Sequence, residues 1–202
     1  RLTSKAFLEG FYFKPRIDKE LLTTFHEGII CLSGCVSSEL NRTLLAGGET
    51  NFQKALEIAT WYRNLFGDDY FIELQNNGLE VQRQAMNGSI DVANKLGIPM
   101  VGTSDVHYIE RKHSESQDIL LCVNTGKFRT DANRMRMDTD EFYLRSPEEM
   151  YAAFPGMDDI LKRTQEIADS VSIELELGRR HFPVYTLPEG KSAEDLLREM
   201  CV

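Results

Sequence analysis

Long apolar runs and secretion signals are missing from the 202-residue sequence. It holds no run of about 18 apolar residues, and its N-terminus lacks the charged, apolar and small-residue pattern of a signal peptide. Cysteine is scarce, and the residues at positions 31, 35, 122 and 201 do not have the dense spacing of a disulfide framework. We therefore expect reduced thiols and a cytoplasmic protein that does not enter a membrane.

Basic residues are too few for the chain to hold nucleic acid by charge alone. With 32 acidic and 23 basic residues the formal charge is −9, whereas phosphate binding needs a local excess of cations. The segment 127–136 is the one candidate patch, with Lys127 and Arg129 as candidate nucleic-acid contacts, although Asp131 and Asp138 dilute its charge. The sequence contains no phosphate-binding glycine loop, nucleophile elbow or HExxH motif. It therefore does not indicate an enzyme of the classes that depend on these motifs.

Apolar residues make up 42% of the chain, which is enough for one substantial core. They alternate between helical spacing and short β-branched or aromatic runs. We predict helices from near Asp18, at 51–66, 79–96, 114–122 and 157–171 and from Ser146, and strands at 28–32, 70–74 and 99–103, with 141–144 as a further candidate strand. Helices that alternate with strands predict an α/β fold with mostly parallel strands, in a sheet or a barrel.

The C-terminal residues have a different character. Pro183 and Pro188 predict an extended connector, and Ser192 then begins a helix with an apolar face and no stop signal. Because the chain also starts at Arg1, we expect it to be a piece of a longer protein.

Side chains suited to metal binding accompany all three main strands. Asp105 and His107 follow the third strand, and Cys35 follows the first. Glu73 lies near the end of the second. Because the carboxyl ends of parallel strands share one edge, we expect these groups to converge there, and all are competent ligands for zinc or a related ion. Taken singly, an Asp-X-His sequence is more often a capping or hydrogen-bonded pair than a metal site, and a cysteine such as Cys35 is more often a small buried residue. Glu73 alone is equally consistent with an ion pair.

Six segments add a more specific pattern: 9–16 (EGFYFKPR), 32–35 (LSGC), 66–75 (FGDDYFIELQ), 103–108 (TSDVHY), 118–127 (DILLCVNTGK) and 142–150 (FYLRSPEEM). In this order they resemble the PHP (polymerase and histidinol phosphatase) domain of bacterial DNA polymerase III alpha subunits. The resemblance covers nearly the whole chain. It implies a partial distorted (β/α) barrel over 1–178, followed over 179–202 by a helical connector and the start of the polymerase body.

The resemblance also implies a metal centre. In this family the barrel rim holds up to three divalent ions, for which zinc, manganese and magnesium are the candidates. Asp105 and His107 match the final Asp-X-His motif, and Cys35 matches the cysteine ligand, while the early His-X-His ligands would precede Arg1.

The implied parent protein is a DNA-directed DNA polymerase, a nucleotidyltransferase that acts on DNA with partner subunits such as a proofreading exonuclease. Its magnesium-binding aspartates would lie beyond Val202, so we expect the piece alone to be inactive in polymerisation. The PHP domain itself could act as a 3′-5′ exonuclease with metal-activated water. The alternatives are a noncatalytic scaffold for a separate exonuclease and a stand-alone PHP phosphoesterase.

Overall fold

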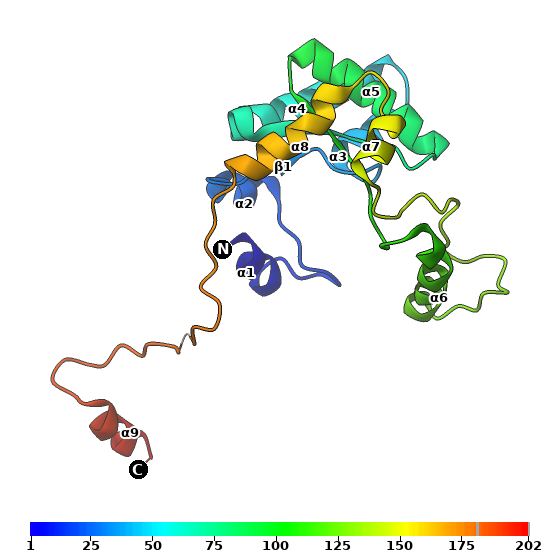
Figure 1. Ribbon diagram of the computed structural model, residues 1–202. Coiled ribbons are helices and arrows are strands. Elements are labelled where there is room, and N and C mark those ends of the chain that lie inside the picture. The colour runs from blue at the N-terminus through cyan, green and yellow to red at the C-terminus, as the bar shows by residue number, and fades with distance from the viewer. Residues whose placement is uncertain (181, 202) are drawn as a thin grey trace. The chain divides into compact units, whose positions relative to one another are not determined.

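The computed structural model describes residues 1–180 and 182–201, so His181 of the predicted connector and Val202 lie outside the described residues. The chain divides into two units, Arg1–Ser170 and Val171–Val202 (Figure 1). The second unit contains an extended stretch and the helix α9 (Ala193–Cys201). No helix among the described residues is both long enough and apolar enough to span a membrane.

A parallel sheet of three strands lies at the centre of the first unit. Its strands are β1 (Cys31–Leu32), β2 (Tyr70–Gln75) and β3 (Met100–Thr103), in the order β1-β2-β3. Leu32 pairs with Phe71, and Gln75 pairs with Thr103. The predicted α/β class with parallel strands is therefore confirmed. The sheet is open across the described residues, so closure into a barrel stays a prediction.

The first unit also contains eight α-helices and two short 3-10 helices: α1 (Leu2–Leu8), α2 (Lys19–Thr24), α3 (Glu39–Leu45), α4 (Glu49–Phe66), η1 (Gly67–Asp69), α5 (Glu80–Leu96), η2 (Arg111–His113), α6 (Ser114–Thr125), α7 (Pro147–Ala153) and α8 (Asp158–Ser170). The helix ends follow from local chemistry. Ser146 and Glu149 form a reciprocal capping box at the start of α7. Gly97, at φ 64°, adopts the left-handed conformation that ends α5.

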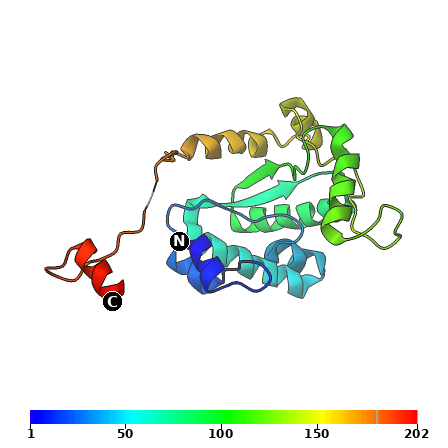
Figure 2. The same ribbon diagram turned by 90° about the horizontal axis from the view of Figure 1, so that it is seen from below.

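The two faces of the sheet meet different helices. A Cβ atom on Gly102 would lie 2.9 Å from Ile160 and Leu161 of α8, so this face of β3 packs directly on α8. Leu74 of β2 pairs with Gly102, so its neighbours Glu73 and Gln75 point to the other face of the sheet. There they line a small cavity together with residues of α5. Figure 2 shows α8 and α5 on opposite sides of the strands.

Most predicted elements are confirmed within a few residues, including α5, which continues through Gly88. Three details differ from the prediction. The strand expected at 28–32 is only Cys31–Leu32, and the candidate strand at 141–144 is a single bridge between Tyr108 and Tyr143. The helices α1 and α3 were not predicted, because each has only seven residues and its apolar pattern is too short to identify from periodicity.

Candidate metal centre

The carboxyl ends of the three strands lie along one edge of the sheet and are joined by side chains. The hydroxyl of Ser33, just after β1, accepts from the Glu73 N–H at 2.9 Å. The Thr103 hydroxyl at the end of β3 donates to the Glu73 carboxylate at 2.5 Å, and the Gln75 amide donates to it at 3.0 Å. Glu73 therefore ties all three strand ends together, whether or not it also binds an ion.

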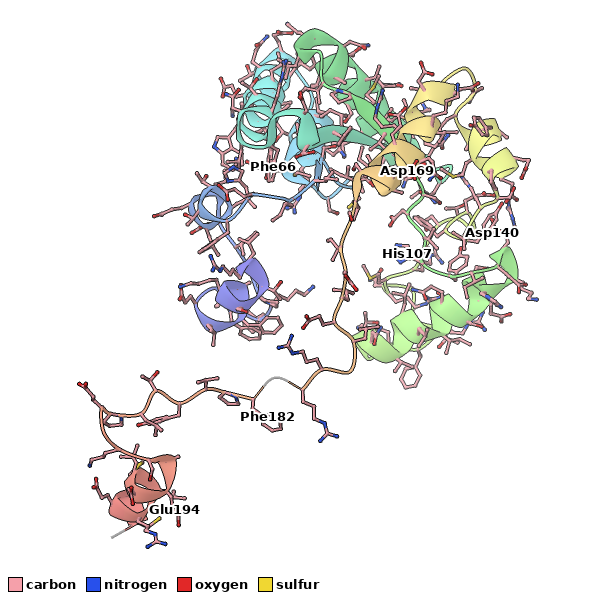
Figure 3. The ribbon with its side chains drawn as sticks, turned by 60° about the vertical axis from the view of Figure 1, so that its left-hand side comes forward. Phe66, His107, Asp140, Asp169, Phe182 and Glu194 are labelled. Carbon is pink, nitrogen blue, oxygen red and sulfur yellow. The ribbon has the colours of Figure 1, made fainter. Side chains whose placement is uncertain are left out.

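Asp105 and His107 lie on the segment that leaves β3 toward α6, and His107 is labelled in Figure 3. The Val106 N–H donates to the Ser104 carbonyl at 2.9 Å, which closes a three-residue turn centred on Asp105. This turn leaves Asp105 Oδ1 3.2 Å from His107 Nε2. The His107 N–H donates to the Phe142 carbonyl at 2.8 Å, and the two rings meet edge-on at 5.3 Å.

The separation of these two side chains suits a shared ion. Two atoms that each lie about 2.1 Å from one divalent ion are about 3.0 Å apart at a right angle and about 3.4 Å apart at a tetrahedral angle. The observed 3.2 Å between Asp105 and His107 falls between these values. It suits a hydrogen-bonded pair equally well. Both side chains are about one third exposed, so solvent and ions reach them.

Cys35 lies in the loop between β1 and α3, and its conformation is held by backbone contacts. Gly34, at φ 82°, uses the left-handed region that favours glycine. The side-chain amide of Asn41 donates to the carbonyls of Gly34 and Cys35, each at 3.1 Å. The Ser38 N–H donates to the Cys35 carbonyl at 2.9 Å. The half-buried Cys35 thiol is therefore presented by an ordered loop at the same edge of the sheet.

Cys31 is poorly suited to binding a metal. It lies inside β1, where burial raises the pKa of its thiol to about 11. Because the thiolate is the form that binds a metal, this pKa disfavours Cys31 as a ligand near neutral pH.

The described residues bring Asp105 and His107 together but do not add a third ligand to them. Within this part of the chain, no group of three or more His, Cys, Asp or Glu side chains is arranged to hold a metal ion. Two buried oxygens in or next to these strand ends, Gln75 Oε1 and Ser104 Oγ, have no hydrogen-bond partner among the described atoms. Because such atoms are rare in folded proteins, this edge has unused capacity to bind a polar group.

Comparison with known proteins finds one family match and several relatives. Residues 1–77 match the PHP domain family. The chain is 44% identical over 201 residues to "DNA polymerase III subunit alpha" of Treponema pallidum, covering 98% of this chain and 17% of that protein. The chain is a homologue of one segment of these alpha subunits. The subunit of Deinococcus radiodurans is 39% identical (98% of this chain, 15% of that protein) and that of Thermus aquaticus 37% (99% and 17%).

The similarity to the alpha subunits extends well beyond the PHP match. Cys35 and Glu73 lie within residues 1–77, whereas Asp105 and His107 lie outside that match but within the alpha-subunit similarity. The chain spans less than one fifth of the length of these relatives. The predicted resemblance is thus confirmed for the segment, and the role of its individual ligands stays a prediction.

The basic segment 127–136 is largely neutralised by nearby acids. Arg129 pairs with Glu115 at 2.9 Å, and Arg134, whose side chain is only 9% exposed, makes a two-pronged contact with Asp118. The hydrogen bond from Arg134 lowers the pKa of the Asp118 carboxyl. Lys127 is exposed. Because Arg129 is already paired with Glu115, a nucleic-acid phosphate would have to displace this carboxylate to bind the guanidinium group. This competition would lower the affinity of the predicted nucleic-acid contact.

Four buried polar residues support the edge. Asn77 lies just beyond β2, whereas Asn41, Gln82 and Ser89 lie on helices and were not predicted. A polar residue in a helix is ordinarily exposed, so none of them attracts attention singly. A usable signal existed, because Gln82 and Ser89 are seven residues apart and fall on the same apolar stripe of α5 as Met86 and Ala93.

Proposed function

We propose that this chain is the PHP-region segment of a bacterial replicative DNA polymerase alpha subunit, a DNA-directed DNA polymerase. The observation that carries the proposal is the 44% identity that runs through 98% of the chain. Residues 1–178 would belong to a distorted (β/α) barrel of the PHP type, in which β1, β2 and β3 are consecutive parallel strands. Residues 179–202 would lead into the polymerase body.

We further propose that Cys35, Asp105 and His107 contribute ligands to a divalent-metal cluster at the sheet edge. Zinc, manganese and magnesium are the candidate ions, and Glu73 is a fourth candidate ligand. Three features support this assignment: the parallel strands, the 3.2 Å separation of Asp105 and His107, and the mixed thiolate, imidazole and carboxylate chemistry. Such an ion would supply activated water for attack on a phosphodiester.

The chain's own residues would then have distinct roles. Asp105 and His107 would present adjacent donor atoms on one turn, and Glu73 would keep the strand ends in register through Thr103 and Ser33. Polymerisation itself would use magnesium held elsewhere in the protein. The partners would be DNA and replicase subunits, including a proofreading exonuclease, in the cytoplasm.

The polymerase assignment is tested with the full-length protein in template-directed primer extension. We expect nucleotide incorporation that requires magnesium. Failure to extend a primer, together with hydrolysis of small phosphate esters, would instead identify a stand-alone PHP phosphoesterase.

The metal assignment is tested by elemental analysis of the same protein, comparing His107→Ala with His113→Ala. His113 lies in η2, where its ring accepts from the Glu110 N–H at 3.3 Å, and it serves as a matched control. We expect zinc or manganese in the unsubstituted protein and in His113→Ala, and loss of most of it in His107→Ala. A metal-free unsubstituted protein would favour the noncatalytic scaffold.

A further inference from the structure

The first unit contains a small set of buried polar side chains. In the described part of the chain these are Asn41, Asn77, Gln82 and Ser89, with exposures of 4%, 0%, 3% and 1%. Burying an amide or a hydroxyl without a hydrogen bond costs about 1–3 kcal/mol, so each such group needs a partner. All four have partners, and these bonds lead from α5 to the Cys35 loop and to Glu141, next to the residue that binds the His107 N–H.

The first connection runs from Ser89 to the Cys35 loop. The Ser89 hydroxyl donates to Asn41 Oδ1 at 2.8 Å. The amide nitrogen of Asn41 then donates to the carbonyls of Gly34 and Cys35, each at 3.1 Å. We call Ser89 and Asn41 the first relay. It fixes the orientation of the Asn41 amide, because the hydroxyl proton of Ser89 points at the oxygen and leaves the nitrogen for the loop.

The second connection runs from Gln82 toward His107. Gln82 and Asn77 bond twice, with the Asn77 N–H donating to Gln82 Oε1 at 2.8 Å and Gln82 Nε2 donating to Asn77 Oδ1 at 3.0 Å. Asn77 Nδ2 donates to the Glu141 carbonyl at 2.9 Å. The next carbonyl, of Phe142, accepts from the His107 N–H at 2.8 Å. We call Gln82 and Asn77 the second relay.

Both relays begin on one face of one helix. Gln82 and Ser89 are seven residues apart, which is about two turns and places them on the same side of α5. This side also lines the small cavity beside Glu73 and Gln75. The helix α5 therefore bonds through Asn41 to the Cys35 loop, and through Asn77 to Glu141, whose neighbour Phe142 accepts from His107.

We propose that Ser89, Asn41, Gln82 and Asn77 are positioning residues that set the Cys35 loop and the His107 segment relative to each other through α5. The proposal deepens the metal-binding role proposed above and rests on it. Its physical basis is that metal affinity depends on ligands being held in place before the ion arrives. The competing explanation is that these residues only satisfy one another inside the core.

Hydrogen exchange on the metal-free, full-length protein distinguishes the two explanations. Ser89→Ala and Gln82→Met each remove one relay with little change in volume. We expect Ser89→Ala to speed amide exchange in residues 33–38 by roughly twofold to tenfold, the effect of losing one hydrogen bond. Exchange at the His107 amide should stay unchanged. Gln82→Met should give the reverse pattern.

A third variant controls for general destabilisation. Val92→Ala lies on α5, is fully buried at 0% exposure and belongs to the apolar core. It should lower the free energy of unfolding and speed amide exchange without favouring either loop. The test compares the increase in exchange rate in residues 33–38 with the increase at the His107 amide. If the ratio of these two increases is the same in Ser89→Ala and Gln82→Met as in Val92→Ala, the relays have no positioning role and the proposal is overturned.

Cobalt(II) binding then links the relays to the metal. The thiolate-to-cobalt charge-transfer band reports bonding to cysteine, so we expect Ser89→Ala to weaken cobalt binding about tenfold and to diminish this band. Val92→Ala should retain both the affinity and the band. An unsubstituted protein that binds no cobalt contradicts the proposed metal role, while the exchange pattern still decides whether the relays position the loops. Normal cobalt binding in Ser89→Ala overturns the positioning role of the first relay.

Discussion

Gly102→Ala tests the contact between the sheet and α8, at a position three residues before Asp105. A Cβ atom on Gly102 would lie 2.9 Å from Ile160 Cδ1 and 2.9 Å from Leu161 Cδ2, closer than carbon atoms normally approach. Both side chains are buried, at 4% and 8% exposure, so neither can swing into solvent. Overpacking of this kind costs about 1–3 kcal/mol.

The expected decrease in melting temperature follows from this cost. A domain of 150–250 residues loses about 2–4 °C per kcal/mol, so Gly102→Ala should lower the transition by about 2–12 °C in thermal unfolding followed by circular dichroism. Gly88→Ala is the matched control. A methyl group there would lie 3.2 Å from the free end of the Leu44 side chain, and alanine favours the helix by up to about 1 kcal/mol. We expect Gly88→Ala to be neutral or stabilising.

A double-mutant cycle identifies the cause of the Gly102→Ala effect. Ile160→Val removes the Cδ1 atom that the new methyl group would meet, and alone it should cost about 0.5–1.5 kcal/mol. In the Gly102→Ala background it should cost less, because it also relieves the clash. Unchanged stability of Gly102→Ala, or strict additivity with Ile160→Val, would refute the packing of α8 on β3 described above.

Three further predictions concern local chemistry. Ser146→Ala removes the cap of α7 and should lower the free energy of unfolding by about 1 kcal/mol in urea titration; an unchanged midpoint would contradict it. Burial raises the pKa of the Cys31 thiol to about 11, so the unfolded chain ionises first, and stability should fall as the pH rises from about 9 to 11. Cys31→Ala should flatten that slope. Burial alone would raise the pKa of Glu141, but hydrogen bonds from Arg145 and Arg111 lower it overall. Its stabilising contribution should therefore be present above about pH 4.3 and be lost on further acidification, and Glu141→Gln should reduce this acid sensitivity.

Much of the first unit could be predicted from the sequence because its elements are long or sharply bounded. The helix α4 and the strand β2 combine a clear period with Gly67 between them, and Ser146-Pro147 marks a helix start by capping alone. The short helices α1 and α3 could not be predicted, because seven residues hold about two turns and give no stable periodicity. The strand β1 is shorter than its apolar run, since only two of its residues pair with β2.

The candidate ligands can be named from the sequence, and their role stays a prediction, whereas the side chains that support their loops could not be found there. Asp105, His107 and Cys35 stand out because metal-binding side chains follow strands, and the parallel order of the strands then places their loops at one edge. Asn41 bonds to carbonyls six and seven residues earlier, and Asn77 bonds to a carbonyl 64 positions away; no sequence pattern encodes either contact. Supporting contacts of this kind depend on the tertiary fold. Candidate metal ligands can therefore be found in the sequence, whereas the residues that position them can be identified only in the structure.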